Sequence, residues 1–451
     1  MAWRPSRGSA ADAGALVCSF LDVASTSLGR ATHYNTREQQ EAAERSSHAQ
    51  LLDFDRDLYA ILLLVPGVSD RARQLGVRAL LGRPRDGHAG MLDGEGEQAV
   101  LEAMISSLPP QRVLKLFARL AARDERVNNA RTRKLILRTL LGSPRLELWS
   151  VKYRSKVRDA LTHAWGRKTT SFLRRVLSTP IAQCSVEDQR ALTRHIGKYA
   201  GRNARIAREC VGFVLGATLE PTLPLLVAFE AAKRDLAAGA KLPIEVLEGI
   251  RSSYHPQVER GTLLELGKRS LSKTQRRQLQ RAANEAAVEV AMDPRDYAAV
   301  DLYIYAYAMG MTDDIAAALV ARGKQAAAGF PVRYAQIGVL VDASASMAGH
   351  ASQKLRPMAV ALALRDMLQA VGEAHRTIYC GGEFRAEDHA NLASPRTHGF
   401  AGLCRPSGET SLAEGLLELL DVDEAQRPEA VYVISDGYEN APAGRFSEVV
   451  D

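Results

Sequence analysis

The stretch QIGVLVDASAS, residues 336–346, decides the fold class of the C-terminal part of the chain. Its first six residues, 336–341, form a largely apolar run of the kind found in strands that are buried on both faces. The run leads directly into Asp342, Ser344 and Ser346, and this alternate spacing lets a loop that leaves a strand turn one row of side chains toward a single centre. We therefore predict a buried strand whose end carries a cluster of side-chain oxygens.

Helices and strands are predicted to alternate after this run. We expect a helix at 354–371, a strand at 376–380, a helix at 411–420 and a strand at 431–435. Such alternation predicts an α/β fold with a parallel, doubly wound sheet. In sheets of this kind, ligands bind beyond the carboxyl ends of the strands.

Two later segments are expected to bring more oxygens to the same edge of the sheet. The segment SGETS, 407–411, opens a helix, and the strand at 431–435 runs into an Asp-Gly pair. A hard divalent cation prefers oxygen ligands, and a set with only two carboxylates leaves the ion able to take a further ligand from outside. The residues therefore predict a ligand-capturing divalent-cation site, with Mg²⁺ as the expected ion. Its predicted ligands are Asp342, Ser344, Ser346, Thr410 and Asp436.

This set resembles the metal-ion-dependent adhesion site (MIDAS) of von Willebrand factor A domains. The family pattern is D-x-S-x-S, then a distant Thr and a distant Asp, and all five positions match in order. The resemblance implies a Rossmann-like domain over 334–451. The family usually adds further strands after the second Asp, so we expect this domain to lack its last strands, with the open sheet edge covered by the helical part or the chain truncated.

The preceding part of the chain has a helical pattern. Apolar residues return every three or four positions from about 50 to 322, with short Pro/Gly breaks between them. This pattern predicts stacked helix pairs in an α-solenoid of the HEAT type over 1–322, and a linker at 323–333. The expected helices are 51–64, 70–81, 98–107, 109–122, 130–142, 150–163, 186–199, 204–215, 222–238, 272–291 and 294–309.

A basic block lies within the helical part. The net charge is +7, but 24 Lys or Arg accompany only 7 Asp or Glu between Arg112 and Glu209. The usual reason for a charge run is a solvated helix face, but the scarcity of opposing charges here favours a polyanion, with RNA the leading candidate. The predicted RNA-binding residues are Arg112, Lys115, Arg119, Arg123, Arg126, Arg131, Lys134, Arg138, Lys152, Tyr153, Arg154, Lys156, Arg158, Arg167, Lys168, Arg174 and Arg175.

The first five of these residues fall at steps of three and four, so they are expected to share one helix face opposite Val113, Leu114 and Leu120. A later helix offers Arg190, Arg194, Lys198 and Arg202. Trp149, Tyr153 and Trp165 lie among the cations and could stack on bases, although aromatic residues at helical spacing more often belong to a core.

A helical repeat that precedes an adhesion-type domain resembles the Ro (TROVE) family of RNA-binding proteins. The segment HYNTREQ, 33–39, is similar to a segment near the start of that module, and VKYR, 151–154, is similar to its K-Y-[KR] segment. The family's glycine pair before the tyrosine and its W-S-H segment are missing here. The resemblance implies a HEAT-like ring that takes 3′ ends of misfolded RNAs in its hole and small Y-type RNAs on its outer surface, near Lys152, Tyr153 and Arg154.

Two other functions remain open at this stage. The first is an adaptor that binds a protein partner, for example a MoxR-type ATPase, through the metal site. The second is a hydrolase with Glu409 as its nearest candidate base. The chain has neither a phosphate-binding G-x-x-x-x-G-K-[ST] loop nor a G-x-G-x-x-G segment after a strand, which argues against nucleotide hydrolysis.

The cysteines predict the compartment. They are an odd, widely spaced set of five without a C-x-x-C pair, which indicates a reducing, cytoplasmic environment. A zinc site made of Cys380, His389, His398 and Cys404 is disfavoured by its irregular spacing. Asp12 and Asp22 interrupt the apolar patch near the N-terminus, so we expect neither a secretion signal nor a membrane segment.

Overall fold

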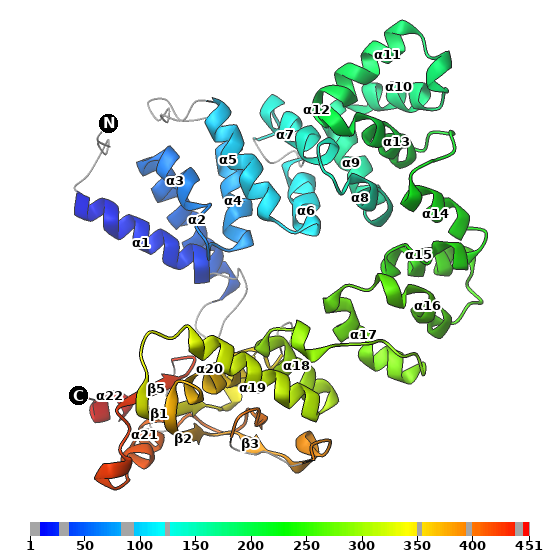
Figure 1. Cartoon of the computed structure of the whole chain (residues 1–451). Coiled ribbons are helices and arrows are strands. Elements are labelled where there is room, and N and C mark those ends of the chain that lie inside the picture. The colour runs from blue at the N-terminus through cyan, green and yellow to red at the C-terminus, as the bar shows by residue number, and fades with distance from the viewer. Residues whose placement is uncertain are drawn as a thin grey trace. The chain divides into compact units, whose positions relative to one another are not determined.

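The computed structural model divides into two compact units, Met1–Ser270 and Leu271–Asp451 (Figure 1). It describes residues 10–26, 36–82, 94–121, 127–349, 354–393, 399–437 and 445–450. Within these ranges, no helix has both the length and the apolar character needed to span a bilayer.

The first unit is built from helices that pack on their neighbours in the chain. Their apolar faces contribute to one core that extends from Phe20 to Leu226. The helices are α1 (Ala10–Thr26), α2 (Arg37–Phe54), α3 (Arg56–Leu62), α4 (Asp70–Leu81), α5 (Gly94–Ser107), α6 (Pro110–Leu120), α7 (Ala130–Leu141), α8 (Leu146–Lys152), α9 (Arg154–Trp165), α10 (Arg167–Leu177), α11 (Val186–Leu192), α12 (Lys198–Ala200), α13 (Ala204–Leu215), α14 (Pro224–Ala232), α15 (Ile244–Tyr254) and α16 (Arg260–Gly267).

Local sequence signals fix several helix ends. The Ser69 side chain accepts a hydrogen bond from the backbone N–H of Ala72, which begins α4, and Gly216 ends α13 in a left-handed conformation with φ of 75°. The predicted helices at 70–81 and 204–215 are therefore confirmed. The predicted helix at 150–163 is wrong, because Tyr153 leaves the helical region and separates α8 from α9.

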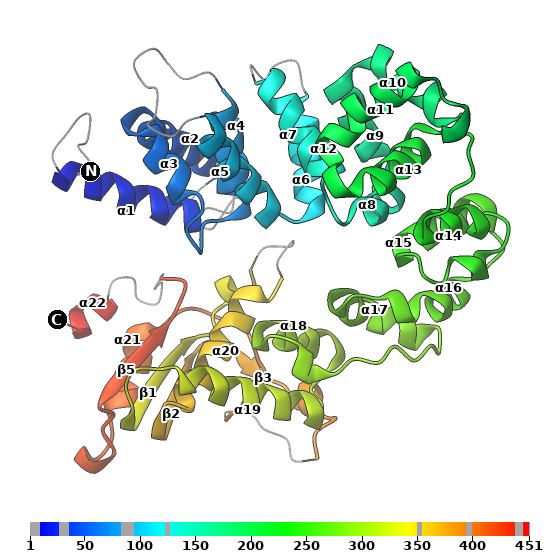
Figure 2. The same cartoon turned by 45° about the horizontal axis from the view of Figure 1, so that its top comes forward.

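The second unit holds a parallel sheet of three strands in the order β2-β1-β5 (Figure 2). The predicted parallel α/β arrangement is thus confirmed. Its helices are α17 (Lys273–Glu285), α18 (Ala299–Met309), α19 (Asp313–Ala328), α20 (Arg356–Gln369), α21 (Leu412–Leu420) and α22 (Arg445–Val450). Its strands are β1 (Tyr334–Asp342), β2 (Gly372–Cys380), β5 (Ala430–Ile434) and a short antiparallel pair, β3 (Glu383–Phe384) and β4 (Cys404–Arg405).

Helices cover both faces of β1. Its alternate residues Ile337, Val339 and Val341 share a core with α18, α19 and α20, whereas Leu340 packs with α21. The approach of α21 depends on Gly338, where an added Cβ would lie 2.8 Å from a methyl carbon of Leu419. Because apolar layers lie on both sides, β1 can place a polar side chain only near its ends.

The boundary between the two parts lies earlier than the sequence predicts. Residues 323–328 of the predicted linker belong to α19, which packs on α20 so closely that a Cβ at Gly323 would lie 3.0 Å from the Asp366 carbonyl oxygen. The tyrosines of α18 also bind the α/β part, since the Tyr307 hydroxyl donates to the carbonyl of Cys404. Because of these long-range contacts, α18 and α19 belong to the second unit.

A buried ion pair holds this layer together. Arg365 and Asp366 are 0% and 1% exposed, and the Arg365 Nη2 atom lies 2.6 Å from Asp366 Oδ1. The guanidinium also donates to the hydroxyls of Tyr303 and Tyr379 at 2.7 and 2.8 Å and to the carbonyl of Gly402 at 2.8 Å. Helix α18, helix α20, strand β2 and the 399–403 turn are therefore joined by one hydrogen-bonded network.

We expect Asp366→Ala to lower the free energy of unfolding of the second unit by about 3–5 kcal/mol, because it leaves a buried arginine without its counterion. Calorimetric unfolding of the full chain measures this change. Asp423→Ala removes an exposed carboxylate of the same unit and is expected to change stability by less than about 0.5 kcal/mol. Equal effects of the two substitutions would contradict the structural role of the pair.

Candidate functional site

The carboxyl end of β1 forms the centre of the candidate metal site. In the register, Asp342 lies opposite Cys380 of β2, and Val341 lies opposite Ile434 of β5, so all three strands end at one edge. Asp342 is fully buried, and its carboxylate accepts hydrogen bonds from the Ser344 backbone N–H at 3.0 Å and from the Ser435 hydroxyl at 2.8 Å.

The other predicted ligands come from three segments of the second unit. The hydroxyl oxygens of Ser344 and Ser346 are 3.0 Å apart, in the tight turn that follows β1. Thr410 is buried in the turn before α21, and Asp436 is exposed directly after Ser435. Direct hydrogen bonds therefore bring together Asp342, Ser344 and Ser346, and the adjoining loops carry Thr410 and Asp436.

Backbone hydrogen bonds fix these loops to one another. The N–H groups of Ala343, Ser407 and Ala345 donate to the carbonyls of Cys380, Ala343 and Gly408 at 2.9, 2.9 and 3.0 Å. Gly381 has a φ of 76°, and a Cβ there would lie 2.6 Å from the carbonyl oxygen of Ser407. Only glycine permits this close approach, which sets the position of the loop that carries Thr410.

The donor set fits a hard cation. Asp342 forms no ion pair with any lysine or arginine that the structure describes, and an uncompensated buried carboxylate is costly. Hydroxyl and carboxylate oxygens are the ligands that Mg²⁺ and Ca²⁺ prefer. In the described ranges there is no group of three or more His, Cys, Asp or Glu side chains suited to a metal ion, so a cation here would depend on the serine and threonine hydroxyls.

The zinc alternative gains no support. The ring nitrogens of His389 already bond to the backbone, since Nδ1 lies 3.1 Å from the Arg385 carbonyl and Nε2 accepts from the Leu403 N–H at 2.9 Å. His398 lies outside the described residues. His389 is therefore a core histidine that aligns the loop before β4.

The predicted basic face of α6 is confirmed for its described residues. Arg112, Lys115 and Arg119 are exposed, whereas Val113, Leu114 and Leu120 are buried. The helix itself ends at Leu120. Arg123 and Arg126 lie outside the described residues.

These three cations line a groove that α6 forms with α2 and α4. The groove has a volume of 760 Å³, and among its described lining residues seven cations accompany two carboxylates, Glu41 and Glu44. Sequence reasoning missed the cations from α2 and α4, because they lie outside the basic block. They are Arg37, Arg45, Arg71 and Arg78. We call this feature the α6 groove.

The remaining predicted cations fall into those that form ion pairs and those that do not. Several form ion pairs within the unit: Arg131 with Glu97, Arg138 with Glu102, Lys152 with Glu245, Arg158 with Asp159, and Arg175 with Asp188. Among described residues, no ion-pair partner is found for Lys115, Arg119, Lys134, Lys156, Arg167 and Lys168. Arg174 donates to the Gly216 carbonyl at 3.1 Å.

Arg154 has a packing role. Its guanidinium carbon lies 4.6 Å from the ring centre of Phe213, and it donates to the Phe213 carbonyl at 3.2 Å. Tyr153, between α8 and α9, is half-buried, and the Lys152 amine lies 5.9 Å from its ring centre. The guanidinium of Arg154 is thus engaged by contacts within the first unit.

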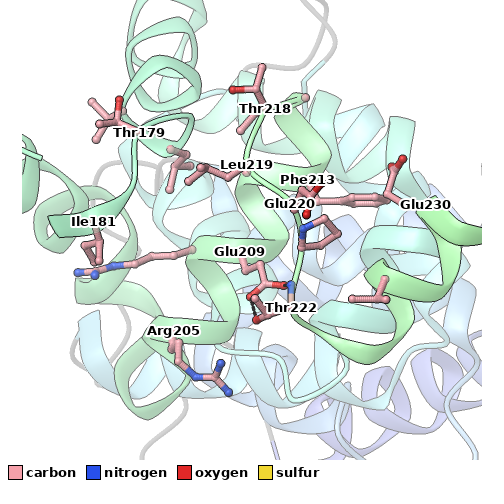
Figure 3. A pocket seen from close by; sticks show the side chains of 18 of the residues that line it. Thr179, Ile181, Arg205, Glu209, Phe213, Thr218, Leu219, Glu220, Thr222 and Glu230 are labelled. Carbon is pink, nitrogen blue, oxygen red and sulfur yellow. Dashed lines mark hydrogen bonds between the residues drawn. The ribbon is translucent and has the colours of Figure 1, made fainter. Parts of the chain in front are cut away.

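A further pocket, of 820 Å³, lies around α13 and the segment that follows it (Figure 3). Figure 3 shows Glu209 reaching toward Thr222, whose hydroxyl donates to the carboxylate at 2.7 Å. Exposed apolar side chains such as Ile181 and Leu219 also line it, beside both cations and carboxylates. This mixed lining distinguishes the pocket from the α6 groove, whose charge is mostly of one sign.

Comparison with known proteins adds no relatives: no family model, no curated protein and no solved structure matches this chain.

Because His48, which lines the α6 groove, is buried, we predict that the stability of the first unit depends on pH. His48 is 7% exposed, and its Nδ1 atom lies 2.6 Å from the Tyr59 hydroxyl. Burial lowers the pKa of His48 from 6.5 to about 4. Between these values the unfolded chain binds a proton that the folded chain does not, so stability is fully present above pH 6.5 and falls by about 3 kcal/mol as pH decreases toward 4.

Denaturant unfolding followed by tryptophan fluorescence measures this loss, because Trp3, Trp149 and Trp165 all precede residue 271. His48→Gln should remove this part of the acid sensitivity and leave the contribution of the carboxylates. An unchanged dependence on pH in the variant would show that His48 is not responsible.

Proposed function

We propose that this chain is a non-catalytic RNA-binding scaffold that also holds a divalent cation at the end of β1. The observation that carries the proposal is the α6 groove, where seven cations face two carboxylates. Arg37, Arg71 and Arg112 form ion pairs with nearby acids. Lys115 and Arg119 form none with any described residue, and this remaining excess of positive charge is suited to a phosphate backbone. Structured RNA with a single-stranded tail, of the Y-like or misfolded class, is the proposed ligand.

The order of the two units along the chain supports this proposal, because it is the order found in the Ro family. A helical unit precedes a unit with a small parallel sheet, in the order that the family has. We propose that the helices are HEAT-like repeats and that the second unit is a von Willebrand factor A type domain. The motif D-x-S-x-S at the end of a buried central strand supports the second assignment.

The proposed metal ligands are those predicted from the sequence, with Mg²⁺ as the expected ion. Asp342 would supply the buried carboxylate, Ser344, Ser346 and Thr410 the hydroxyls, and Asp436 the exposed carboxylate. A bound cation would offer a coordination position to an anionic group from outside. The role of the loops is to hold these oxygens at one edge of the sheet.

The RNA proposal predicts a loss of binding in Lys115→Glu/Arg119→Glu. We expect affinity for a structured RNA with a single-stranded 3′ tail to fall at least about tenfold, and the slope of log K against log salt to decrease by about 1.8, because two phosphate contacts are removed. Fluorescence anisotropy across a salt series measures both quantities.

The matched control is Lys241→Glu/Arg269→Glu, which makes the same charge change at exposed positions of the same unit. It should retain most of the affinity. If the control weakens binding as strongly as the groove variant, net charge rather than the α6 groove governs the interaction, and the proposed surface is wrong.

The metal proposal predicts that Mg²⁺ stabilises the second unit. At a concentration one hundred times Kd, the free energy of unfolding should rise by about 2.7 kcal/mol in the native chain and stay unchanged in Asp342→Asn. Calorimetric unfolding with and without Mg²⁺ measures this difference, and Asp423→Ala serves as the carboxylate control. Equal stabilisation of Asp342→Asn would refute the assignment of Asp342 as a ligand.

The exposure of Asp436 favours a second candidate, an adaptor that presents its cation to a carboxylate of a protein partner such as a MoxR-type ATPase. Partner binding would then be lost with EDTA and in Asp342→Asn. RNA binding would be weak and equal in the α6 groove variant and its control. Retention of partner binding in EDTA would exclude this function.

A further inference from the structure

A second basic hollow in the first unit carries a more specific inference. It lies among α7, the end of α9 and the continuous helical segment 186–200, and it is distinct from the α6 groove in every lining residue. Its volume is 540 Å³, within the roughly 300–1,000 Å³ of sites that bind small ligands. We call it the α7 pocket.

The charge of the α7 pocket has one sign. Arg133 and Lys134 come from α7, Arg194 and Lys198 come from the segment 186–200, and the described lining contains no Asp or Glu. All four side chains are exposed and form no ion pair with any described residue. The pocket also includes Asn129, which caps α7, so the positive end of the helix dipole adds to the same field.

The walls of the pocket are partly aromatic. Trp165, at the end of α9, and Tyr199, in α12, are half-buried and line the pocket beside the cations. The Lys198 amine lies 5.9 Å from the ring centre of Tyr199, which places a cation and an aromatic face together. Phosphate alone would need no such rings, whereas a nucleobase stacks on them.

The backbone on one side of the pocket is irregular. Residues Thr193–Gly197 form a π-helical turn between α11 and α12, and this turn contains Arg194 and His195. Such turns insert an extra residue into a helix and often occur at functional sites. Burial, with help from Arg194, lowers the pKa of His195, so its imidazole is neutral at pH 7 and can both donate and accept a hydrogen bond.

We propose that the α7 pocket binds one nucleotide of single-stranded RNA, with the phosphate among Arg133, Lys134, Arg194 and Lys198 and the base against Trp165 and Tyr199. The inference rests on the proposed function, RNA binding, and adds to it a site for an individual unpaired nucleotide. It identifies an additional surface that acts alongside the α6 groove.

The first test uses a twelve-residue oligoadenylate, which has no stable secondary structure to occupy the α6 groove as a duplex. Arg194→Ala/Lys198→Ala should lower the slope of log K against log salt by up to about 0.7, since the pocket holds one phosphate and each neutralised phosphate of a single strand contributes about 0.7. The control, Arg190→Ala/Arg202→Ala, removes two exposed cations of the same region that do not line the pocket and should leave the slope unchanged.

The second test separates stacking from charge. Trp165→Ala should weaken oligoadenylate binding by roughly tenfold, whereas Trp165→Phe keeps an aromatic face and should retain most of the affinity. Quenching of tryptophan fluorescence by the oligonucleotide should decrease in both variants, because Trp165 lines the pocket whereas Trp149 is buried at 7% exposure. Circular dichroism and thermal unfolding of each variant establish that it is folded.

The outcomes distinguish this inference from the proposed function. If oligoadenylate binding is insensitive to the pocket variants but structured RNA still requires Lys115 and Arg119, the α7 pocket is not a nucleotide site and the RNA-binding function stands. If the native chain binds neither RNA, both fail. Equal competition by inorganic phosphate or by a phosphopeptide would overturn the nucleotide assignment in favour of a general anion site.

Discussion

The burial of β1 on both faces is the constraint on which the second unit depends. A strand enclosed by α18, α19 and α20 on one side and by α21 on the other can place polar groups only where it leaves the apolar layer. Because β2 and β5 run parallel to β1, their loops arrive at the same edge. The loops are therefore crowded together. Backbone hydrogen bonds between them and close contacts at glycines hold them in fixed positions around Asp342.

Much of this arrangement could be predicted from local sequence. The apolar run at 336–341 identifies a strand that the structure extends to Tyr334–Asp342, and the alternation after it identifies the parallel partners. The unit boundary could not be predicted in this way. The periodicity of α18 and α19 matches that of the preceding helices, and long-range contacts, such as those of Tyr303 and Gly323 with α20, show which unit they join.

The same distinction applies to the candidate sites. The spacing of Asp342, Ser344 and Ser346 is a local signal, and the structure places the two hydroxyls next to each other. Ser435 was missed because its hydroxyl reaches Asp342 only through the register of β5 on β1, across 93 positions of the chain. Cations that lie far apart in the chain and come together only when the helices pack cannot be recognised from the sequence either.

Composition alone also cannot distinguish cations that pack inside a unit from cations that line a groove. Arg154 lies within the basic block yet packs on Phe213, 59 residues away, whereas Arg45 and Arg78 lie outside the block and line the α6 groove. A count of basic residues therefore locates a charged region, and the packing of the helices decides which of its side chains face solvent. Residues of the basic block contribute to at least two separate cationic hollows, which have different lining residues.

The π turn at Thr193–Gly197 has a consequence for how such a chain could diverge. An extra residue in a helix shifts everything after it by about 100° around the axis. A one-residue deletion in this turn would swing Lys198 and Tyr199 away, while Arg133, Lys134 and Trp165 stayed on their own helices. Two otherwise similar proteins that differ by a single codon in this turn could thus share a fold and differ in the side chains that line the α7 pocket.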